Sequence, residues 1–517
     1  MPKTAIVSGG SLPFGAVVPS RAERVLKRVQ QLQSCVKISR LGQFSTERVH
    51  KVNDYCQHAS LVRVILVEIL LPWPALLVAL IAESIPLQNP ADGRRSNYGA
   101  WIRLWIAIAS GSVGSLFQVR ASVTGLSYGK IAVVAIGTGT GASIMMMLWA
   151  SLWVFPLPFS LVLMGLPIQI MFLIFSFVVV RQFGSEKVST MENRTERVLN
   201  KSLKERMYPL LSQSMLGAVY VVFGILFKRG SNKQQFGLLV FMPVMKLSLK
   251  HLVARLASND KSSIPAVVAF SVDVFNGLYS SICMQSSGLW WTPFVMITLN
   301  IVRAAFTLFE LNHSVTTLRG LERQMEGSRQ EWDSADTIAN DSPSGTSSLI
   351  TGAQWQTKKN ISTRQLRSNQ SNTVPSSIQS RRRAMSSKIL FRLEYLALVA
   401  YVESIIPLVY AVHLSALYHL PNAKYYLRLQ NLTSDKIQYI RVGIAVYTSV
   451  EIVTLVWLHV VLKRKFGFSL IYQLAFVLER EMERLQGHLF YWVLLILQLT
   501  LVHSAGMDFT FTFAWMT

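Results

Sequence analysis

Residues 60–83 read SLVRVILVEILLPWPALLVALIAE, a run in which apolar side chains follow one another almost without interruption. A helix needs about 20 predominantly apolar residues to cross the hydrocarbon core of a bilayer. A surface helix of a soluble protein would instead show a charged face opposite its apolar one. The run contains only three charged residues, Arg63, Glu68 and Glu83. It therefore predicts a membrane-spanning helix.

Ten further runs of this kind are distributed along the chain of 517 residues. They lie at 99–118, 131–153, 157–180, 209–227, 236–254, 264–285, 291–311, 391–414, 438–462 and 486–505. Charged residues make up only 15% of the sequence, against about a quarter in soluble domains. The sequence predicts an all-α, polytopic membrane protein with about eleven transmembrane helices, in the plasma membrane or an endomembrane. The sixth run, with Pro243 and Lys246 in it, is the least regular.

Lys and Arg are unevenly distributed between the segments that join these runs. With the N-terminus in the cytosol, 36 of them fall in cytosolic segments and 8 on the opposite side. Cytosolic loops of membrane proteins are enriched in Lys and Arg, so we expect this orientation. The sequon Asn431-Leu-Thr433 would then lie on the far side, where Asn431 could be glycosylated. The net charge of +24 is explained by orientation and by contact with anionic lipids, and nucleic-acid binding is not expected.

Four regions follow from this layout. They are a basic cytosolic segment (1–59), a membrane domain of about eight spans (60–311), a cytosolic loop (312–390) and a membrane domain of about three spans (391–517). The loop is basic and rich in Ser, Asn and Gln, a composition that predicts disorder. Apolar residues at helical spacing in 25–36 predict an amphipathic helix, on the membrane surface or packed on cytosolic loops. Residues 468–485 predict a second cytosolic helix.

Ionisable residues inside the predicted spans are the main candidates for a functional site, because charge in a membrane is energetically unfavourable. Acids lie at Glu68, Asp273, Glu403 and Glu451, and bases at Arg63, Arg103, Lys246 and Arg303. Glu68, Asp273, Glu403, Glu451 and Arg303 are the residues that we predict to bind an ion, a proton or a substrate.

Glu403 and Glu451 are the favoured pair in this set. They lie near the centres of two consecutive, antiparallel spans, so their carboxylates could face each other and share a proton or bind a cation. Two structural alternatives are an ion pair with Arg303 or another base, and a protonated Glu hydrogen-bonded between helices.

Several runs contain residues that break or closely pack helices. Pro72 and Pro74 interrupt the first run, and broken helices expose backbone groups that bind substrate in transporters. Neighbouring helices can instead satisfy those groups. Gly137 with Gly141, and Ser110 with Gly114, have the small-xxx-small spacing of close helix packing. The first run also contains VEILLP (67–72), which is similar to VESIIP (402–407) and could mark an internal repeat.

Sequence motifs of enzymes are missing. The chain has no GxSxG, Walker A or HExxH motif, and its three Cys and nine His are scattered. We therefore expect no enzyme activity, no cofactor and no metal site.

The C-terminal part contains three distinctive patterns: HLPN-x-x-YY from His419, QLAFVLE from Gln473 and H-x-x-G-x-D-x-x-F-x-F from His503. Over roughly its last 130 residues the chain resembles a large family of oomycete multi-pass transmembrane proteins. The resemblance supports the architecture and implies no substrate. It also implies that Glu403, Glu451, His503 and Asp508 belong to a shared pattern.

Two functions are compatible with these features. The first is a transporter- or channel-like protein with carboxylates near the membrane midplane, acting on an ion or small molecule. The second is a membrane scaffold or receptor that recruits partners through its cytosolic loop.

Overall fold

The computed structural model describes 46–121, 126–157, 160–184, most of 213–257, 263–286, scattered positions in 294–323, 376–426, Leu429, 433–466, 469–498 and 501–504. These residues are almost entirely helical and form no sheet. The one β-bridge among them joins Tyr426 to Leu501. An all-α fold is therefore confirmed for the described part of the chain. The segments 25–36 and 505–517 lie outside it.

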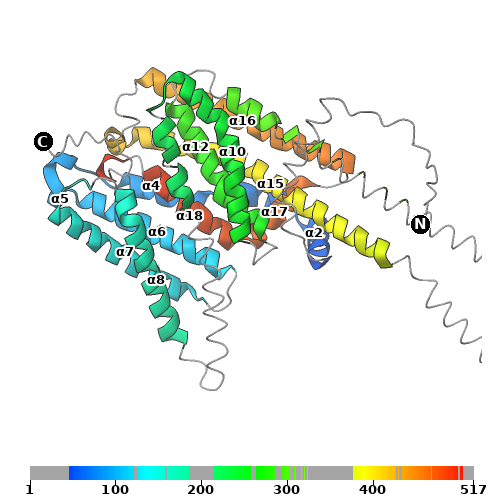
Figure 1. The fold of residues 1–517 in the computed structure, drawn as a ribbon, viewed down its shortest axis with the longest axis horizontal. Helices are drawn as coiled ribbons and strands as arrows, with labels where there is room; N and C mark the ends of the chain where they lie inside the picture. Colours follow the sequence, from blue (N-terminus) through cyan, green and yellow to red (C-terminus); the bar gives the residue numbers. More distant parts are fainter. Residues whose placement is uncertain are drawn as a thin grey trace, which may run out of the picture.

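The helices are gathered into one bundle (Figure 1). In chain order the longer ones are α2 (Thr46–His58), α3 (Leu61–Leu70), α4 (Trp73–Ser84), α6 (Tyr98–Arg120), α7 (Tyr128–Leu152), α8 (Ser160–Gly184), α10 (Asn232–Leu256), α11 (Ile264–Val268) continuing through η3 (Ala269–Asp273) into α12 (Val274–Ser286), α15 (Ser376–His419), α16 (Ser434–Phe466), α17 (Leu470–Arg480) and α18 (Met482–Gln498). Short helical turns join several of them, α5 (Gly93–Ser96) and η4 (Pro421–Tyr425) among them.

Seven helices in the described part are long and apolar enough to cross a membrane. They are Leu61–Ser84, Tyr98–Arg120, Tyr128–Leu152, Asn232–Leu256, Ile264–Met284, Ser387–His419 and Asp435–Arg464. Each coincides with one of the predicted runs. The sixth run is among them, because Pro243 lies inside α10 without ending it. The chain is thus compatible with a multi-pass integral membrane protein.

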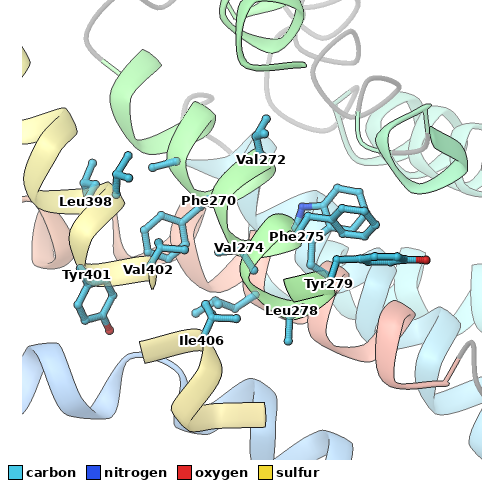
Figure 2. Close-up of a cluster of buried hydrophobic side chains, with 14 of the residues drawn as sticks. Phe270, Val272, Val274, Phe275, Leu278, Tyr279, Leu398, Tyr401, Val402 and Ile406 are labelled. Carbon is cyan, nitrogen blue, oxygen red and sulfur yellow. The ribbon is translucent and has the colours of Figure 1, made fainter. Parts of the chain in front are cut away.

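The helix that runs from α11 through η3 to α12 forms the centre of the bundle. In its apolar window 94% of residues are buried, against 28–67% in the other six candidates. The other helices expose large apolar side chains such as Ile65, Leu148 and Val453, as expected of surfaces that face lipid. Figure 2 shows Phe270 and Phe275 of the central helix within the buried apolar cluster, beside side chains of α15.

The central helix changes its winding at Ala269–Asp273, which form a π-helical segment. Such segments are rare and frequently occur at functional sites. Both polar residues of this segment, Ser271 and Asp273, are buried. No periodicity in the sequence distinguishes these residues from those of an ordinary helix.

Pro72 and Pro74 break the first run as predicted, and a two-residue turn separates α3 from α4. Proline has no N–H, so Pro72 leaves the carbonyl of Glu68 without its usual helical donor. The Tyr401 hydroxyl of α15 donates a hydrogen bond to this carbonyl at 2.7 Å. A neighbouring helix thus satisfies the break, the second of the two roles predicted for it.

The boundary of the predicted disordered loop is wrong at its C-terminal end. Residues 376–390 were assigned to the loop, but α15 already begins at Ser376. This stretch follows Pro375 and contains neither Gly nor Pro, so its polar side chains can continue a helix. Ile389 and Leu390 are buried, which gives the added turns tertiary support. The predicted helix at 468–485 is confirmed by α17, which covers Leu470–Arg480.

Gly114 of α6 and Gly487 of α18 bring these helices into backbone contact. A Cβ atom on Gly114 would lie 2.6 Å from the carbonyl oxygen of Gly487, and one on Gly487 would be closer still to that of Gly114. The predicted small-residue interface of Gly114 is therefore formed with α18.

Alanine at Gly487 is expected to destabilise the protein by about 1–3 kcal/mol, because either helix must move to relieve the overlap. Gly443→Ala in α16 is the matched control. A Cβ there meets open space, so the helix should gain about 0.5–1 kcal/mol. Thermal unfolding in detergent measures both, and equal stability of the two variants would contradict the interface.

Candidate functional site: a buried ion cluster between three helices

Two lysines of α10 provide the positive charges of the cluster. Lys246 and Lys250 are four residues apart and therefore lie on the same face of the helix. Both are buried, with 7% and 5% of their surface exposed. A buried ammonium group requires a charged partner, and each lysine has one on the central helix.

Asp273, at the end of the π segment, is that shared partner. Its Oδ1 atom lies 2.7 Å from the Lys246 Nζ atom and 2.8 Å from the Lys250 Nζ atom. The side chain has no solvent-exposed surface. One carboxylate oxygen thus lies between two ammonium groups inside the bundle.

Glu403 of α15 completes the cluster. Its Oε1 atom accepts a hydrogen bond from the Lys246 Nζ atom at 2.9 Å. The Lys246 ammonium group is therefore shared between Asp273 and Glu403, on two different helices. The described cluster contains two positive and two negative groups, so its charges balance without a bound ion.

The structure gives Glu403 and Glu451, the predicted pair, a polar partner each. Glu403 is held by Lys246, which agrees with the structural alternative of an ion pair with a base. Glu451 of α16 instead accepts a hydrogen bond from the Asn300 side chain at 2.7 Å, and the same amide donates to the Tyr447 hydroxyl. Sequence position placed both acids at mid-span, but the direction of each side chain depends on tertiary packing.

The other predicted site residues are placed as follows. Asp273 joins the cluster, and Glu68 lies on α3 at the Pro72 break. Arg303 and Asn431 lie outside the described residues.

A second polar group lies on the other side of the π segment. The Ser271 hydroxyl is 3.4 Å from the Nδ1 atom of His488 on α18. Gln213 lies 2.7 Å from the same nitrogen and also exchanges hydrogen bonds with Gln118 of α6. Ser271 and Asp273 thus give the central helix polar contacts on two of its sides.

Another buried ion pair lies at one end of the bundle. Arg103 of α6 and Glu83 of α4 form an ion pair, and the Tyr426 hydroxyl bonds to both. Burial and the nearby Glu83 carboxylate raise the pKa of Tyr426 well above its usual value. The hydroxyl therefore remains a donor to Glu83 at any physiological pH.

Residues of the C-terminal sequence patterns join this end of the bundle. The Asn422 amide donates to the carbonyls of Glu83 and Ile85 at 2.7 Å and accepts from the Leu87 N–H at 3.1 Å. His503 lies 2.7 Å from the carbonyl oxygen of Gln88. Asn422 and His503 thus stabilise the loop after α4. None of these hydrogen bonds involves a residue of the ion cluster.

The opposite end of the bundle has its own ion pairs. Arg48 of α2 contacts Glu394 of α15 at 2.6 Å, with both side chains buried. Arg63 donates to both carboxylate oxygens of Glu479 in α17 at 2.8 and 2.6 Å, and the Tyr55 hydroxyl donates to one of them at 2.8 Å. These contacts hold α2 and α17 against the end of the bundle.

The Glu479 contacts predict a pH-dependent contribution to stability. The hydrogen bond from Arg63 lowers the pKa of Glu479 below its usual value. A carboxylate of this kind stabilises the fold above its unfolded pKa of about 4.3, and the contribution is lost as the pH falls through the folded pKa. Glu479→Gln should therefore cost up to about 1 kcal/mol at neutral pH, since Arg63 is largely exposed. Chemical denaturation of both proteins at falling pH measures this, and a difference unchanged down to about pH 3 would contradict it.

Metal ligands do not gather in the described part of the chain. No group of three or more His, Cys, Asp or Glu residues there could hold one metal ion. The cluster itself consists of ammonium and carboxylate groups, which exchange protons and bind ions of opposite charge.

Comparisons of the chain with known protein families, with curated proteins and with solved structures find no match. The resemblance to the oomycete family stays a prediction.

Sequence reasoning missed part of this arrangement. Lys250 is a third charged member of the α10–η3 contact, and its spacing from Lys246 was a usable signal. Glu83, at the very end of its run, gave no such signal, because charges are common at helix ends. His488 and Gln213 are ordinary polar residues in the sequence, and only their burial marks them.

Proposed function

We propose that this protein is a transporter- or channel-like membrane protein whose site is the cluster of Lys246, Lys250, Asp273 and Glu403. The observation that supports the proposal most is the position of four charged groups around the π segment of the central helix. Replacing buried ion pairs by apolar residues is often neutral or stabilising, so stability alone is a weak reason for having them. Ionisable groups inside membrane helices commonly mark ion or substrate pathways.

The topology that accompanies this proposal has about eleven crossings and a cytosolic N-terminus. The distribution of Lys and Arg supports the orientation, and the seven long apolar helices support the multi-pass character. Protease protection of tags at the N-terminus and in the loop at 312–390 tests it. Both tags should be digested from the cytosolic side only, and a glycan on Asn431 should be accepted only on the other side.

The shared ammonium group of Lys246 suggests how the site works. A proton or cation that reaches Glu403 would neutralise its carboxylate and leave Lys246 with Asp273 alone. α10 and α15 would then lose an attraction that joins them, while α10 and the central helix keep theirs. A ligand can shift a conformational equilibrium only through such differential contacts. Exchange of partners at Lys246 therefore provides a physical link between ion binding and helix movement.

Flux into proteoliposomes tests the proposed function. A panel of monovalent cations and an imposed proton gradient are the probes, with empty liposomes as the blank. We expect wild-type protein to carry a flux that falls at least about tenfold in Glu403→Gln, a change of about 1.4 kcal/mol in the barrier. Glu451→Gln is the comparison, because Glu451 accepts a hydrogen bond from Asn300, and this variant should reduce the flux less than Glu403→Gln.

Deletion of residues 326–372 separates this function from a scaffold function. The deletion removes much of the loop and leaves α15 whole. A carrier should keep its flux, whereas a scaffold that recruits partners through the loop should lose them. Wild-type protein without any flux, in vesicles where its folding is verified, would refute the carrier.

A further inference from the structure

Glu68 differs from the buried acids of the candidate spans. Each of those acids has a polar or charged side chain against its carboxylate: Arg103 at Glu83, Lys246 and Lys250 at Asp273, Arg48 at Glu394, Lys246 at Glu403 and Asn300 at Glu451. The Oε1 atom of Glu68 is buried and has no hydrogen-bond partner among the described residues. No ion pair of Glu68 occurs in that part of the chain either.

The surroundings of Glu68 are apolar on both sides. On one side Val64 and Leu71 are buried in the bundle, with 0% and 2% of their surface exposed. On the other side Ile65 and Ile69 are 44% and 50% exposed, on a helix whose outer face would contact lipid. The Glu68 side chain is partly buried and so lies at the boundary between protein and lipid.

The backbone at Glu68 is also unusual. Pro72 frees the Glu68 carbonyl, and the Tyr401 hydroxyl occupies it at 2.7 Å. Figure 2 shows the Tyr401 ring directed from α15 toward the ribbon of the N-terminal helices. The Tyr401 hydroxyl thus donates its hydrogen to the main-chain carbonyl and not to the Glu68 carboxylate. One turn further on, the Leu71 carbonyl accepts a hydrogen bond from Gln486 of α18 at 2.7 Å.

The charged groups on the helices around α3 have partners of their own. On α17, Glu479 contacts α3 and is held by Arg63 of that helix. Arg63 lies five residues before Glu68, about 7.5 Å along the helix axis. On α15 the facing titratable group is Tyr401, and on α18 the contact is the neutral Gln486. Among the described residues, therefore, no cation is placed to neutralise Glu68.

We propose that Glu68 is a proton-binding site at the lipid boundary. An ionised carboxylate with neither a cation nor a hydrogen-bond donor in an apolar environment is strongly disfavoured, whereas the neutral acid is tolerated. The bound ligand is a proton on the carboxyl group. The proton leaves to water, and the carboxylate remains, only when Glu68 reaches an aqueous surface. The break at Pro72 next to it is the point where α3 can move relative to α4.

The proton site itself does not depend on the proposed function. Only its consequence, coupling of the proton to transport, rests on that function. In a carrier, Glu68 would make the proton a coupling ion, in addition to the ion that binds at Glu403. Binding of the proton itself is a property of the residue and can be measured without any flux.

Labelling with dicyclohexylcarbodiimide, an apolar reagent that enters membranes, tests the site. The carboxyl proton is transferred to one nitrogen of the reagent, the carboxylate oxygen bonds to its central carbon, and rearrangement gives a stable N-acylurea. Only a protonated carboxyl group reacts in this way. We expect mass spectrometry of the membrane-reconstituted protein to find the adduct on Glu68, at least about tenfold above Glu403, an apparent difference of about 1.4 kcal/mol in availability.

Four comparisons make the result decisive. A water-soluble carbodiimide should label Glu68 poorly, because the group faces lipid. Glu68→Gln should abolish the adduct, and Tyr401→Phe should retain it, since that hydroxyl bonds to the main chain. Glu68→Asp keeps a carboxyl group and should label as well, which guards against a folding defect in the Gln variant.

Two results would overturn the proposal: a Glu68 peptide without adduct in folded protein, or equal labelling of Glu68 and Glu403. Either result leaves the flux of the wild-type protein untouched. Conversely, labelled Glu68 in a protein without flux would refute the carrier and keep the proton site.

Discussion

Asp273→Asn is expected to lower the free energy of unfolding by about 3–5 kcal/mol, the range for removing one partner of a buried ion pair. Asp273 contacts both Lys246 and Lys250 and is fully buried. In the variant, Glu403 would be the one carboxylate left in the cluster to neutralise two ammonium groups. Asparagine has nearly the same shape as aspartate. The loss of stability would therefore come from the missing charge and not from a cavity.

Thermal or urea unfolding in detergent measures this effect. Glu47→Gln is the matched control, because it breaks an ion pair with Lys51 that is exposed on α2 and worth only about 0.2–1 kcal/mol. The double variant Asp273→Asn with Lys250→Met restores the balance of charge and should recover much of the stability. Equal effects of Asp273→Asn and Glu47→Gln would contradict the buried cluster.

Arg103→Met is expected to lower the free energy of unfolding by a similar amount, because it breaks the buried Arg103–Glu83 ion pair. Glu83 would remain fully buried without its guanidinium partner, which should cost about 3–5 kcal/mol. Adding Glu83→Gln removes the remaining charge and should restore most of the loss, because a neutral pair needs no counter-charge. Tyr426→Phe should cost less, about 1–3 kcal/mol, since it removes hydrogen bonds and no charge.

A double-mutant cycle over Arg103 and Glu83 measures the coupling directly. The same unfolding assay provides all four corners. Additive effects of the two substitutions would show that the residues act independently and would contradict the ion pair.

Seven of the eleven predicted runs coincide with helices of the described residues that are long and apolar enough to cross a membrane. A helix such as α16 must be apolar on its exposed side as well as its buried side, so its whole length is visible as a run. The break at Pro72 is likewise a local property of proline and was predicted.

Contacts between helices were much less predictable. Lys246 and Glu403 lie 157 positions apart, and nothing local to either residue selects the other. The π segment depends on how the central helix packs on all its neighbours. Glu403 and Glu451 share a depth in the membrane, but depth leaves open the direction in which each side chain points. The mid-span acids were therefore identified, while the partners of both were not.

The central claim is that the buried cluster is a transport site. The most direct test of this claim is the double variant Lys246→Met, Glu403→Gln. It removes one charge of each sign, so the cluster stays balanced and the protein should fold with nearly unchanged stability. Flux into proteoliposomes is then measured beside the wild type. We predict a stable protein whose flux falls at least about tenfold. A stable double variant with the flux of the wild type would show that the cluster serves packing alone.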